Sequence, residues 1–374
     1  MARILRQQIL YAHSHFHAAF PSIARFSDGN LLLAFRRARN GNWLLSEEKL
    51  RGMDLINRMD HIDSRSHIVM FELDQHGDLL DGMDTLPFDP EAGDQDPSLL
   101  ILPDDKVFLA AFSWYPLPAD AAQHIDGKVP PGEDHPGCRF LFWGAHSSLR
   151  ERAGGSWLST HRYILPDGGF GYSLSPGDDK KIAGSVRGQP LFKDGKLYLA
   201  LYAGSRNDAA LFISGDLGET WRFSSTIACD PEGKIAFQEP ALCHDGKGGF
   251  VCFLRTTGAE GRLATSHSPD GVDWSEPVLH DLVGHPFNPL QLSDGRIFLS
   301  YGYRYEPFGI RARLLEHALQ DPDQAEEIII RDDGPCADIG YPWAVQLTDS
   351  QIMVVYYFTA ASGLRQVEGT WLEI

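Results

Sequence analysis

The hydrophobic pattern of this chain is repetitive. A proline opens a short run of strand-forming residues, an acidic turn follows, and a second run completes each copy. The six copies begin at Pro21, Pro97, Pro190, Pro240, Pro289 and Pro342. Four of the turns contain Asp-Gly, which supplies the positive φ of a tight β-turn. Because Val, Ile, Leu, Phe and Tyr fill the flanking positions, each copy is predicted to be a β-hairpin.

The spacing of the copies predicts how the hairpins are arranged. Neighbouring prolines are separated by 76, 93, 50, 49 and 53 residues, and the path from Pro342 through both termini to Pro21 adds 53. Gaps near fifty residues suit one four-stranded sheet each, so six units predict an all-β fold, a six-bladed β-propeller. Residues 3–10 and 366–374 both read as strands, and we expect them to pair and close the sixth blade.

A single domain is predicted to use the whole chain, residues 1–374. A polar, aperiodic Pro/Gly-rich stretch is interpreted as an insertion around residues 115–137, which explains the wider spacing of the second blade. A hydrophobic fraction of 43% with 11% aromatic residues can build a sizeable core.

The net charge, the N-terminus and the cysteines indicate which partners, location and cofactors to expect. A formal charge of −18 disfavours nucleic acid and anionic membranes, whereas a locally basic pocket can still bind a small acidic ligand. The N-terminus lacks the apolar core of a signal peptide and no segment approaches the length of a transmembrane helix, so a cytoplasmic location is predicted. The five cysteines are odd in number and lack CxxC spacing, so no disulfide framework, metal or cofactor is expected. The oligomeric state is left open.

Two turns between hairpins carry a more specific pattern. The segment 214–221 reads SGDLGETW, and a shortened copy at 268–274 reads SPDGVDW. In such a turn the Asp accepts backbone N–H bonds, the Gly allows the φ that closes it, and the Trp packs between neighbouring sheets. These turns therefore mark a fold and not a catalytic site.

The pattern S-x-D-x-G-x-T-W is the Asp-box of sialidases and related propellers. Together with the six hairpins, the two boxes make the chain resemble the sialidase superfamily across nearly its whole length. The resemblance implies a glycosidase that removes a terminal acidic sugar, sialic acid or a related carboxylated sugar, with retention of configuration. The Asp-box alone is less specific, because it also occurs in propellers that are not enzymes.

Three arginines share one offset from the prolines. Arg36, Arg255 and Arg304 each follow the proline of their hairpin by fifteen residues, so all three are predicted to lie on one face of the ring. Guanidinium groups bind a carboxylate through paired hydrogen bonds. Sialidases hold the carboxylate of sialic acid with three arginines from the first, fourth and fifth blades, and the resemblance implies this role here.

The first blade departs from the family pattern. Sialidases usually carry Arg-Ile-Pro there, whereas this chain has Ala19-Phe20-Pro21. Either Arg36 or Arg37 supplies the charge from the adjacent strand end, or the triad is incomplete and the substrate is a uronic acid or another acidic sugar.

Residues just before the prolines begin the innermost strands. Among them, Glu239 and Tyr341 look like the glutamate and the tyrosine of the sialidase catalytic pair. The resemblance implies Tyr341 as nucleophile and Glu239 as its base. A neutral phenol avoids repulsion by the substrate carboxylate, but with a pKa of about 10 it needs a base at neutral pH; a tyrosine nucleophile is a known exception among glycosidases. The alternative is a core aromatic and a blade-entry cap.

A third group must protonate the leaving group. Sialidases place this aspartate in a loop just before a strand of the first blade, which implies Asp63, with Asp60 second. The alternative for either residue is a solvated helix end. Other pocket candidates are Asp96, Arg187 and Asp338.

Two other functions remain open on the same fold. A polysaccharide lyase would use Tyr341 or a histidine to remove a proton beside a neutralised carboxylate, and its unsaturated product would absorb in the near ultraviolet. The other alternative is a non-catalytic propeller that binds a sugar and does not cleave it.

Overall fold

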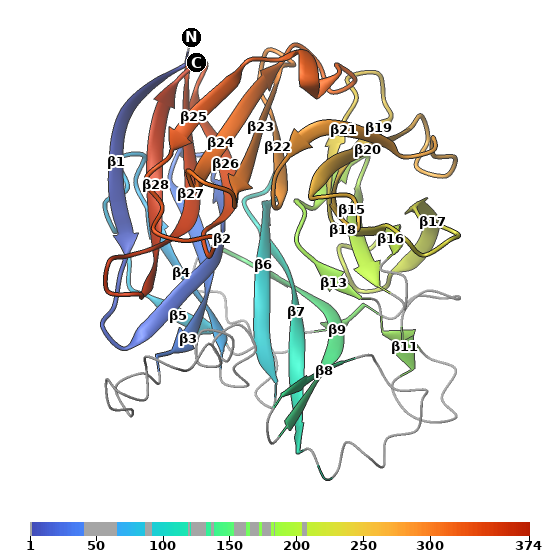
Figure 1. Ribbon diagram of the computed structural model, residues 1–374, viewed down its shortest axis with the longest axis horizontal. Coiled ribbons are helices and arrows are strands. Elements are labelled where there is room, and N and C mark those ends of the chain that lie inside the picture. The colour runs from blue at the N-terminus through green and yellow to red at the C-terminus, as the bar shows by residue number, and fades with distance from the viewer. Residues whose placement is uncertain are drawn as a thin grey trace.

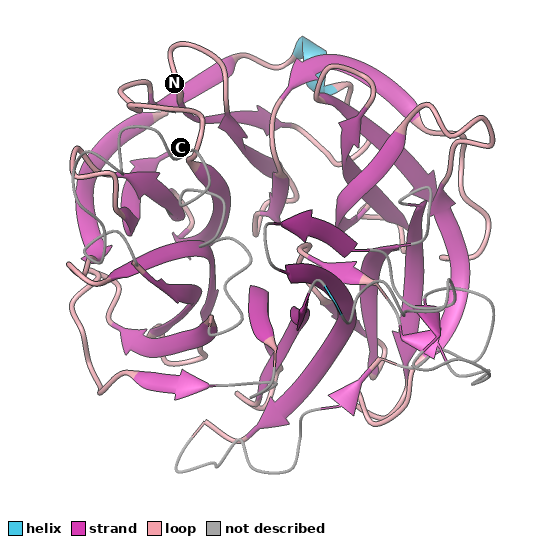
Figure 2. Ribbon diagram, turned by 60° about the horizontal axis from the view of Figure 1, so that its bottom comes forward, coloured by secondary structure: helices cyan, strands magenta, loops and turns pink. Residues whose placement is uncertain are grey.

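The computed structural model describes residues 2–40, 66–86, 92–118, 120, 132–135, 138–152, 162–164, 172–173, 181–182, 184–203 and 208–374. Its sheets stand side by side around a central axis (Figure 1 and Figure 2). The predicted all-β six-bladed propeller is confirmed. In the described part of the chain, no helix combines the length and the apolar character that crossing a membrane requires.

The first three blades follow one another along the chain. Blade 1 consists of β2 (Phe16–Arg25), β3 (Leu31–Arg39), β4 (His67–Leu73) and β5 (Asp84–Leu86). Blade 2 consists of β6 (Gly93–Ile101), β7 (Val107–Pro118), β9 (Cys138–Arg150) and β10 (Arg162–Tyr163), with β8 (Gly132–His135) paired to β9. Blade 3 consists of β13 (Ser185–Val186), β14 (Leu191–Lys193), β15 (Lys196–Ala203), β16 (Asp208–Ser214) and β17 (Arg222–Ala228). β11 (Tyr172–Ser173) and β12 (Lys181–Ile182) form a separate pair.

The last three blades complete the ring. Blade 4 consists of β18 (Ala236–His244), β19 (Phe250–Thr257), β20 (Arg262–Ser268) and β21 (Val278–Val283). Blade 5 consists of β22 (Phe287–Gln291), β23 (Ile297–Tyr303), β24 (Gly309–Leu315) and β25 (Glu327–Arg331), with the short helix η2 (Pro322–Gln324) before β25. Blade 6 consists of β26 (Gly340–Thr348), β27 (Gln351–Thr359), β28 (Arg365–Glu373) and β1 (Arg3–Tyr11).

The two ends of the chain close the ring. β1 pairs antiparallel with β28, from Arg3 opposite Glu373 to Tyr11 opposite Val367, as the sequence predicts. This pairing makes the N-terminal strand the outer strand of blade 6 (Figure 1). Blade 6 therefore joins both termini and fixes the first blade beside the last.

Each junction between neighbouring blades is filled by one cluster of buried apolar side chains. Between blades 2 and 3, for example, Phe108 and Phe212 are fully buried in the same cluster. The Asp-box tryptophan Trp221 is 5% exposed and packs in that cluster, with its ring centroid 6.1 Å from that of Phe108. The tryptophan of the box thus packs between neighbouring sheets, as predicted.

The Asp-box turn closes through its own side chains. Asp216 accepts hydrogen bonds from the backbone N–H of Thr220 at 2.9 Å and from the Thr220 hydroxyl at 2.7 Å. Ser214 Oγ donates to Asp216 at 2.8 Å, and Gly218 has the positive φ of 94° that the turn needs. Since the Asp216 carboxylate accepts hydrogen bonds within the turn, its role there is structural and not catalytic.

Candidate active site

Four residues that precede the prolines share an unusual backbone conformation. Phe20, Asp96, Glu239 and Tyr341 have φ values of 56°, 43°, 47° and 51°, which are left-handed. At each of them the strand register shifts by a β-bulge. A left-handed residue other than glycine is uncommon, and bulges redirect side chains next to active sites. The repeated bulge therefore gives the inner strands of blades 1, 2, 4 and 6 one shared means of redirecting a side chain.

Tyr341 and Glu239 are in direct contact, although 102 residues separate them in the sequence. The Tyr341 hydroxyl donates a short hydrogen bond to Glu239 Oε1. Arg255 Nη1 donates to the other carboxylate oxygen, Glu239 Oε2, at 3.0 Å. The phenol, the carboxylate and the guanidinium thus form one continuous chain of hydrogen bonds across blades 4 and 6.

The surroundings of the pair set opposite protonation states. Burial alone would raise the pKa of Glu239, but the charge of Arg255 and the hydrogen bond from Tyr341 lower it overall. Burial, followed by the negative charge of Glu239, raises the pKa of Tyr341 above its usual value. Before any ligand binds, the pair is therefore a carboxylate that accepts and a neutral phenol that donates.

Arg36 lies beside Ala19, the position at which the family pattern has its first-blade arginine. The strand pairing sets Arg36 directly opposite Ala19, on the same face of the sheet. Paired residues of neighbouring strands have Cβ atoms about 5 Å apart. The small side chain of Ala19 leaves room for Arg36, whose guanidinium carbon lies 5.9 Å from the Phe20 ring and whose charge acts on Asp96.

Arg304 is held by blade 6. Its Nη2 donates to the Tyr357 hydroxyl at 2.8 Å, its Nε donates to the Ile339 carbonyl at 3.1 Å, and its guanidinium carbon lies 5.3 Å from the Tyr341 ring. Tyr357 in turn donates to Asp338 at 2.9 Å, and Asp338 forms an ion pair with the buried Arg365. Asp338, a predicted pocket residue, therefore helps to hold Arg304 in place through the Tyr357 hydroxyl.

Arg37 points away from Arg36. Its Nε donates to His67 Nε2 at 2.8 Å and its guanidinium lies 4.5 Å from the Phe16 ring. Neighbouring residues of a strand project to opposite sides, so the two arginines of β3 cannot serve one pocket. Of the two arginines named for blade 1, the strand directs Arg36 and not Arg37 toward Asp96.

Asp96 and Arg187 are buried members of the same site. Asp96 is 4% exposed, and burial raises its pKa to about 7, against the positive charges of Arg187 and Arg36. Arg187 is 3% exposed and lies 4.9 Å from the Tyr341 ring. Among the described residues, the four guanidiniums of Arg36, Arg187, Arg255 and Arg304 thus interact electrostatically with three carboxyl groups, those of Glu239, Asp96 and Asp338.

Three further residues of the site escaped the sequence analysis. Tyr357 follows Pro342 by the same fifteen residues as the arginines follow their prolines, so the offset itself contained the signal. Tyr202 is in the shorter third hairpin, and its pKa is raised by burial and by the charges of Glu239 and Asp96. His285 precedes β22, where burial and the charges of Arg255 and Arg304 lower its pKa to about 4, so the imidazole is neutral at pH 7. The predicted acids Asp60 and Asp63 lie outside the described residues.

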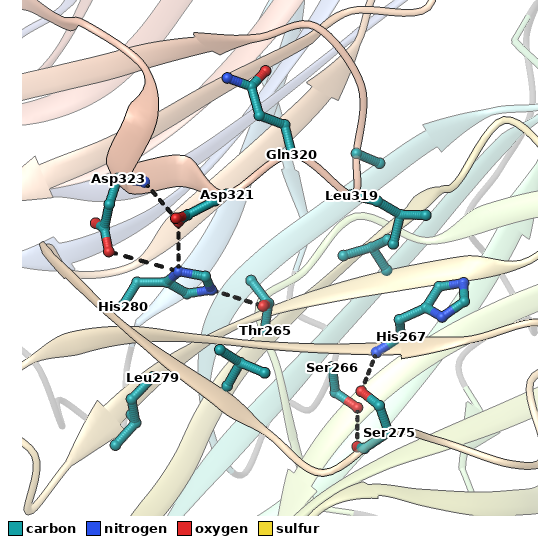
Figure 3. A pocket seen from close by; sticks show the side chains of 13 residues that line it. Thr265, Ser266, His267, Ser275, Leu279, His280, Leu319, Gln320, Asp321 and Asp323 are labelled. Carbon is teal, nitrogen blue, oxygen red and sulfur yellow. Dashed lines mark hydrogen bonds and ion pairs between the residues drawn. The ribbon is translucent and has the colours of Figure 1, made fainter.

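A cavity away from this site lies between the outer strands of blade 4 and the segment after β24 (Figure 3). It measures about 450 Å³ and contains a cluster of His280, Asp321 and Asp323. His280 is already bonded on both ring nitrogens, to Thr265 Oγ1 at 2.8 Å and to Asp321 Oδ1 at 3.2 Å. Asp323 accepts the backbone N–H of Leu282 at 2.9 Å. These groups satisfy one another and hold η2 against β21.

Comparison with known proteins places this geometry in a family. The model of the BNR repeat-like domain matches residues 146–354, more than half of the chain. The chain belongs to the BNR repeat-like family. This BNR repeat-like protein has a propeller fold similar to that of a sialidase, in agreement with the resemblance that the Asp-boxes indicate.

Several solved structures resemble this BNR repeat-like protein. A protein of unknown function from Dyadobacter fermentans is 31% identical, with 100% of this chain and 99% of that chain covered and a TM-score of 0.86. The NanB sialidase from Streptococcus pneumoniae is 15% identical over 98% of this chain and 70% of its own, with a TM-score of 0.66. The α-L-arabinanase from Penicillium chrysogenum is 10% identical over 99% and 98%, with a TM-score of 0.63. At 15% and 10% identity the likeness concerns the fold. Comparison with curated protein sequences finds no match.

The buried Asp96 leads to a prediction about stability. Its pKa rises from 3.8 to about 7 on folding, so the folded protein holds a proton that the unfolded chain releases. The corresponding stability is complete below about pH 4 and is lost as the pH rises through about 7. We expect Asp96→Asn, which cannot ionise, to be more stable than wild type by up to ~4 kcal/mol at about pH 8 and to match it at about pH 4.

Thermal unfolding at the two pH values measures this difference. Asp273→Asn, a change at an exposed carboxylate, serves as the control and should leave the melting temperature unchanged at both. An equal effect of Asp96→Asn at both pH values would contradict a buried carboxyl that is protonated below neutral pH.

Proposed function

We propose that the protein is a retaining exo-glycosidase that removes a terminal acidic sugar, sialic acid or a related carboxylated sugar, from a glycoside. The observation that carries the proposal is the hydrogen-bonded chain of Tyr341, Glu239 and Arg255. It pairs a neutral phenol with a carboxylate that is ready to accept its proton, beside an excess of guanidinium groups. The sialidase and the arabinanase of similar fold agree with a glycosidase in general.

The charge of the pocket selects the substrate. Arg36, Arg255 and Arg304 come from three blades, and the described acids whose charges act on them are Glu239, Asp96 and Asp338. Asp96 is partly protonated near neutral pH, which leaves the pocket more positive. Among the described residues, these guanidinium groups and that of Arg187 outnumber the carboxyl groups, so a substrate carboxylate is favoured over a neutral sugar.

The pair performs the first half of the reaction. Tyr341 Oη attacks the anomeric carbon while its proton passes to Glu239 Oε1, and the bond to the leaving oxygen breaks. A neutral nucleophile is suited to a carbon that already bears a carboxylate, because a carboxylate nucleophile would be repelled. Arg255 stabilises the carboxylate form of Glu239 that accepts the proton.

The second half restores the enzyme. Water attacks the anomeric carbon of the glycosyl-tyrosine, and the phenol departs with the proton returned by Glu239. Two inversions give net retention of configuration. Protonation of the leaving oxygen and deprotonation of the water need a further acid and base, for which the sequence resemblance suggests Asp63.

Replacing the nucleophile separates turnover from binding. We expect Tyr341→Phe to lower kcat on an aryl glycoside of the acidic sugar by at least about 1,000-fold, because the variant cannot form the covalent intermediate. Binding of the carboxylated product should persist. The assay uses a panel of aryl glycosides of acidic sugars, including sialic acid.

Tyr301→Phe is a matched control for this experiment, since Tyr301 of β23 also donates to a carboxylate, that of Glu327 in β25, at 2.7 Å, within blade 5. It should keep full activity. Full turnover by Tyr341→Phe would contradict the proposal. Near-ultraviolet absorption of the product would indicate a lyase, and binding with no turnover of any panel member would indicate a sugar-binding propeller.

The arginines are tested by removing the ligand charge. We expect Arg304→Lys to weaken binding of a carboxylated sugar about 10- to 100-fold, because lysine cannot replace the guanidinium hydrogen bonds. The carboxamide analogue of the same sugar should bind equally well to variant and wild type. Calorimetric titration measures both, and an equal loss for the two ligands would exclude carboxylate recognition by Arg304.

A further inference from the structure

A buried arginine of blade 3 crosses the centre of the ring. Arg187, which follows β13, donates from Nη2 to the Tyr341 carbonyl at 2.8 Å and to the Pro21 carbonyl at 3.1 Å. Blades 3 and 6 are three positions apart in a six-bladed ring and therefore face each other across its axis. One guanidinium thus joins blade 3 to blade 6 and to blade 1.

The contacts of Arg187 coincide with the left-handed backbone positions. Its carbonyl accepts a hydrogen bond from Ser98 Oγ at 3.1 Å, so blade 2 is included. Each of these bonds ends at or within two residues of Phe20, Asp96 or Tyr341, whose φ values are 56°, 43° and 51°. A left-handed residue other than glycine costs about 1–3 kcal/mol and persists only where its surroundings fix it. Arg187 is a contact that these three positions share.

Arg187 also contacts the Tyr341 side chain. Its guanidinium carbon lies 4.9 Å from the Tyr341 ring and 5.2 Å from the Trp343 ring. Its Nη1 is buried and has no hydrogen-bond partner among the described residues. The backbone and the ring of Tyr341 are therefore both held from the side of blade 3.

We propose that Arg187 is a positioning residue: its bonds to the carbonyls of Tyr341 and Pro21 fix the backbone that aims the Tyr341 phenol at Glu239. The effect on catalysis rests on the proposed function, whereas the effect on the Tyr341–Glu239 contact does not. The charge of Arg187 also lowers the pKa of the buried Asp96, and two substitutions separate the hydrogen bonds of Arg187 from its charge.

Arg187→Lys keeps the charge but cannot donate to two carbonyls in the fixed fork of a guanidinium. Arg187→Met loses both the charge and the hydrogen bonds to the two carbonyls. We expect both variants to lower kcat on the order of 100-fold, with a smaller change in KM, because a nucleophile displaced by about 1 Å loses its alignment. The pH at which Asp96 ionises should rise by about one to three pH units in Arg187→Met and remain near the wild-type value in Arg187→Lys.

The ionisation of Asp96 is followed without substrate. The measurement is the pH dependence of the melting temperature of each variant, relative to the same variant carrying Asp96→Asn. Arg313 of β24 provides the matched control, since its Nη1 donates to the carbonyls of Pro322 and Ala325, each at 2.9 Å, in and directly after η2 of blade 5. Arg313→Met should lower the melting temperature and change neither kcat nor the ionisation of Asp96.

A second readout reports Tyr341 directly. In protein labelled with ¹³C at tyrosine Cζ, the Tyr341 resonance is assigned by its loss in Tyr341→Phe. We expect this resonance to shift or broaden in Arg187→Lys and Arg187→Met and to be unchanged in Arg313→Met. The readout holds even if wild type cleaves no member of the glycoside panel, so failure of the proposed function and failure of this inference are distinguishable.

An unchanged Tyr341 resonance in folded Arg187→Met would overturn the inference, whatever the ionisation of Asp96 shows. If Arg187→Met does not fold, Arg187→Lys decides by itself, because it retains the buried charge. An unchanged Tyr341 resonance in folded Arg187→Lys would then overturn the positioning role. A shifted resonance would support it.

Discussion

The hydrogen bond from Tyr341 to Glu239 is the constraint on which the site depends. It joins the inner strand of the last blade to that of the fourth, and only closure of the ring brings these strands together. Burial alone would protonate the carboxylate, and Arg255 prevents this by donating to the second carboxylate oxygen. The proton is thus held on the phenol, opposite an acceptor that is ready to take it. Closure by β1 and β28 therefore supports the chemistry as well as the fold.

The site is assembled from features that oppose stability. Left-handed backbone at Asp96, Glu239 and Tyr341 is strained, the carboxyl of Asp96 is buried, and guanidinium groups outnumber carboxyl groups among the described residues around it. Such features persist where the surrounding structure fixes them. Here the six apolar clusters at the blade junctions provide that support. The excess of guanidinium groups is the ground for proposing an anionic ligand.

The architecture could be predicted because it repeats. Hairpin turns, Asp-boxes and spacing are local signals, and six copies of a local signal determine a ring. The site could be predicted only as far as it follows the same repeat. The offset of Arg36 from its proline could be counted. Whether Arg36 or Arg37 faces the site depends on the strand pairing, which sets Arg36 opposite Ala19. Arg187 was named as a pocket residue, yet its bonds to the carbonyls of opposite blades have no sequence signal, because backbone acceptors are the same in every residue.

The central claim is that the Tyr341 oxygen becomes bonded to the sugar. An aryl glycoside of the acidic sugar with fluorine beside the anomeric carbon slows release of a covalent intermediate, because fluorine destabilises the cationic transition state. Incubation with such a reagent followed by mass spectrometry of the intact protein and of its peptides measures the bond directly. The account predicts a mass increase of one sugar, located on the peptide that contains Tyr341. A label on any other residue, or release of the aryl group with no labelled protein under rapid quenching, would contradict it.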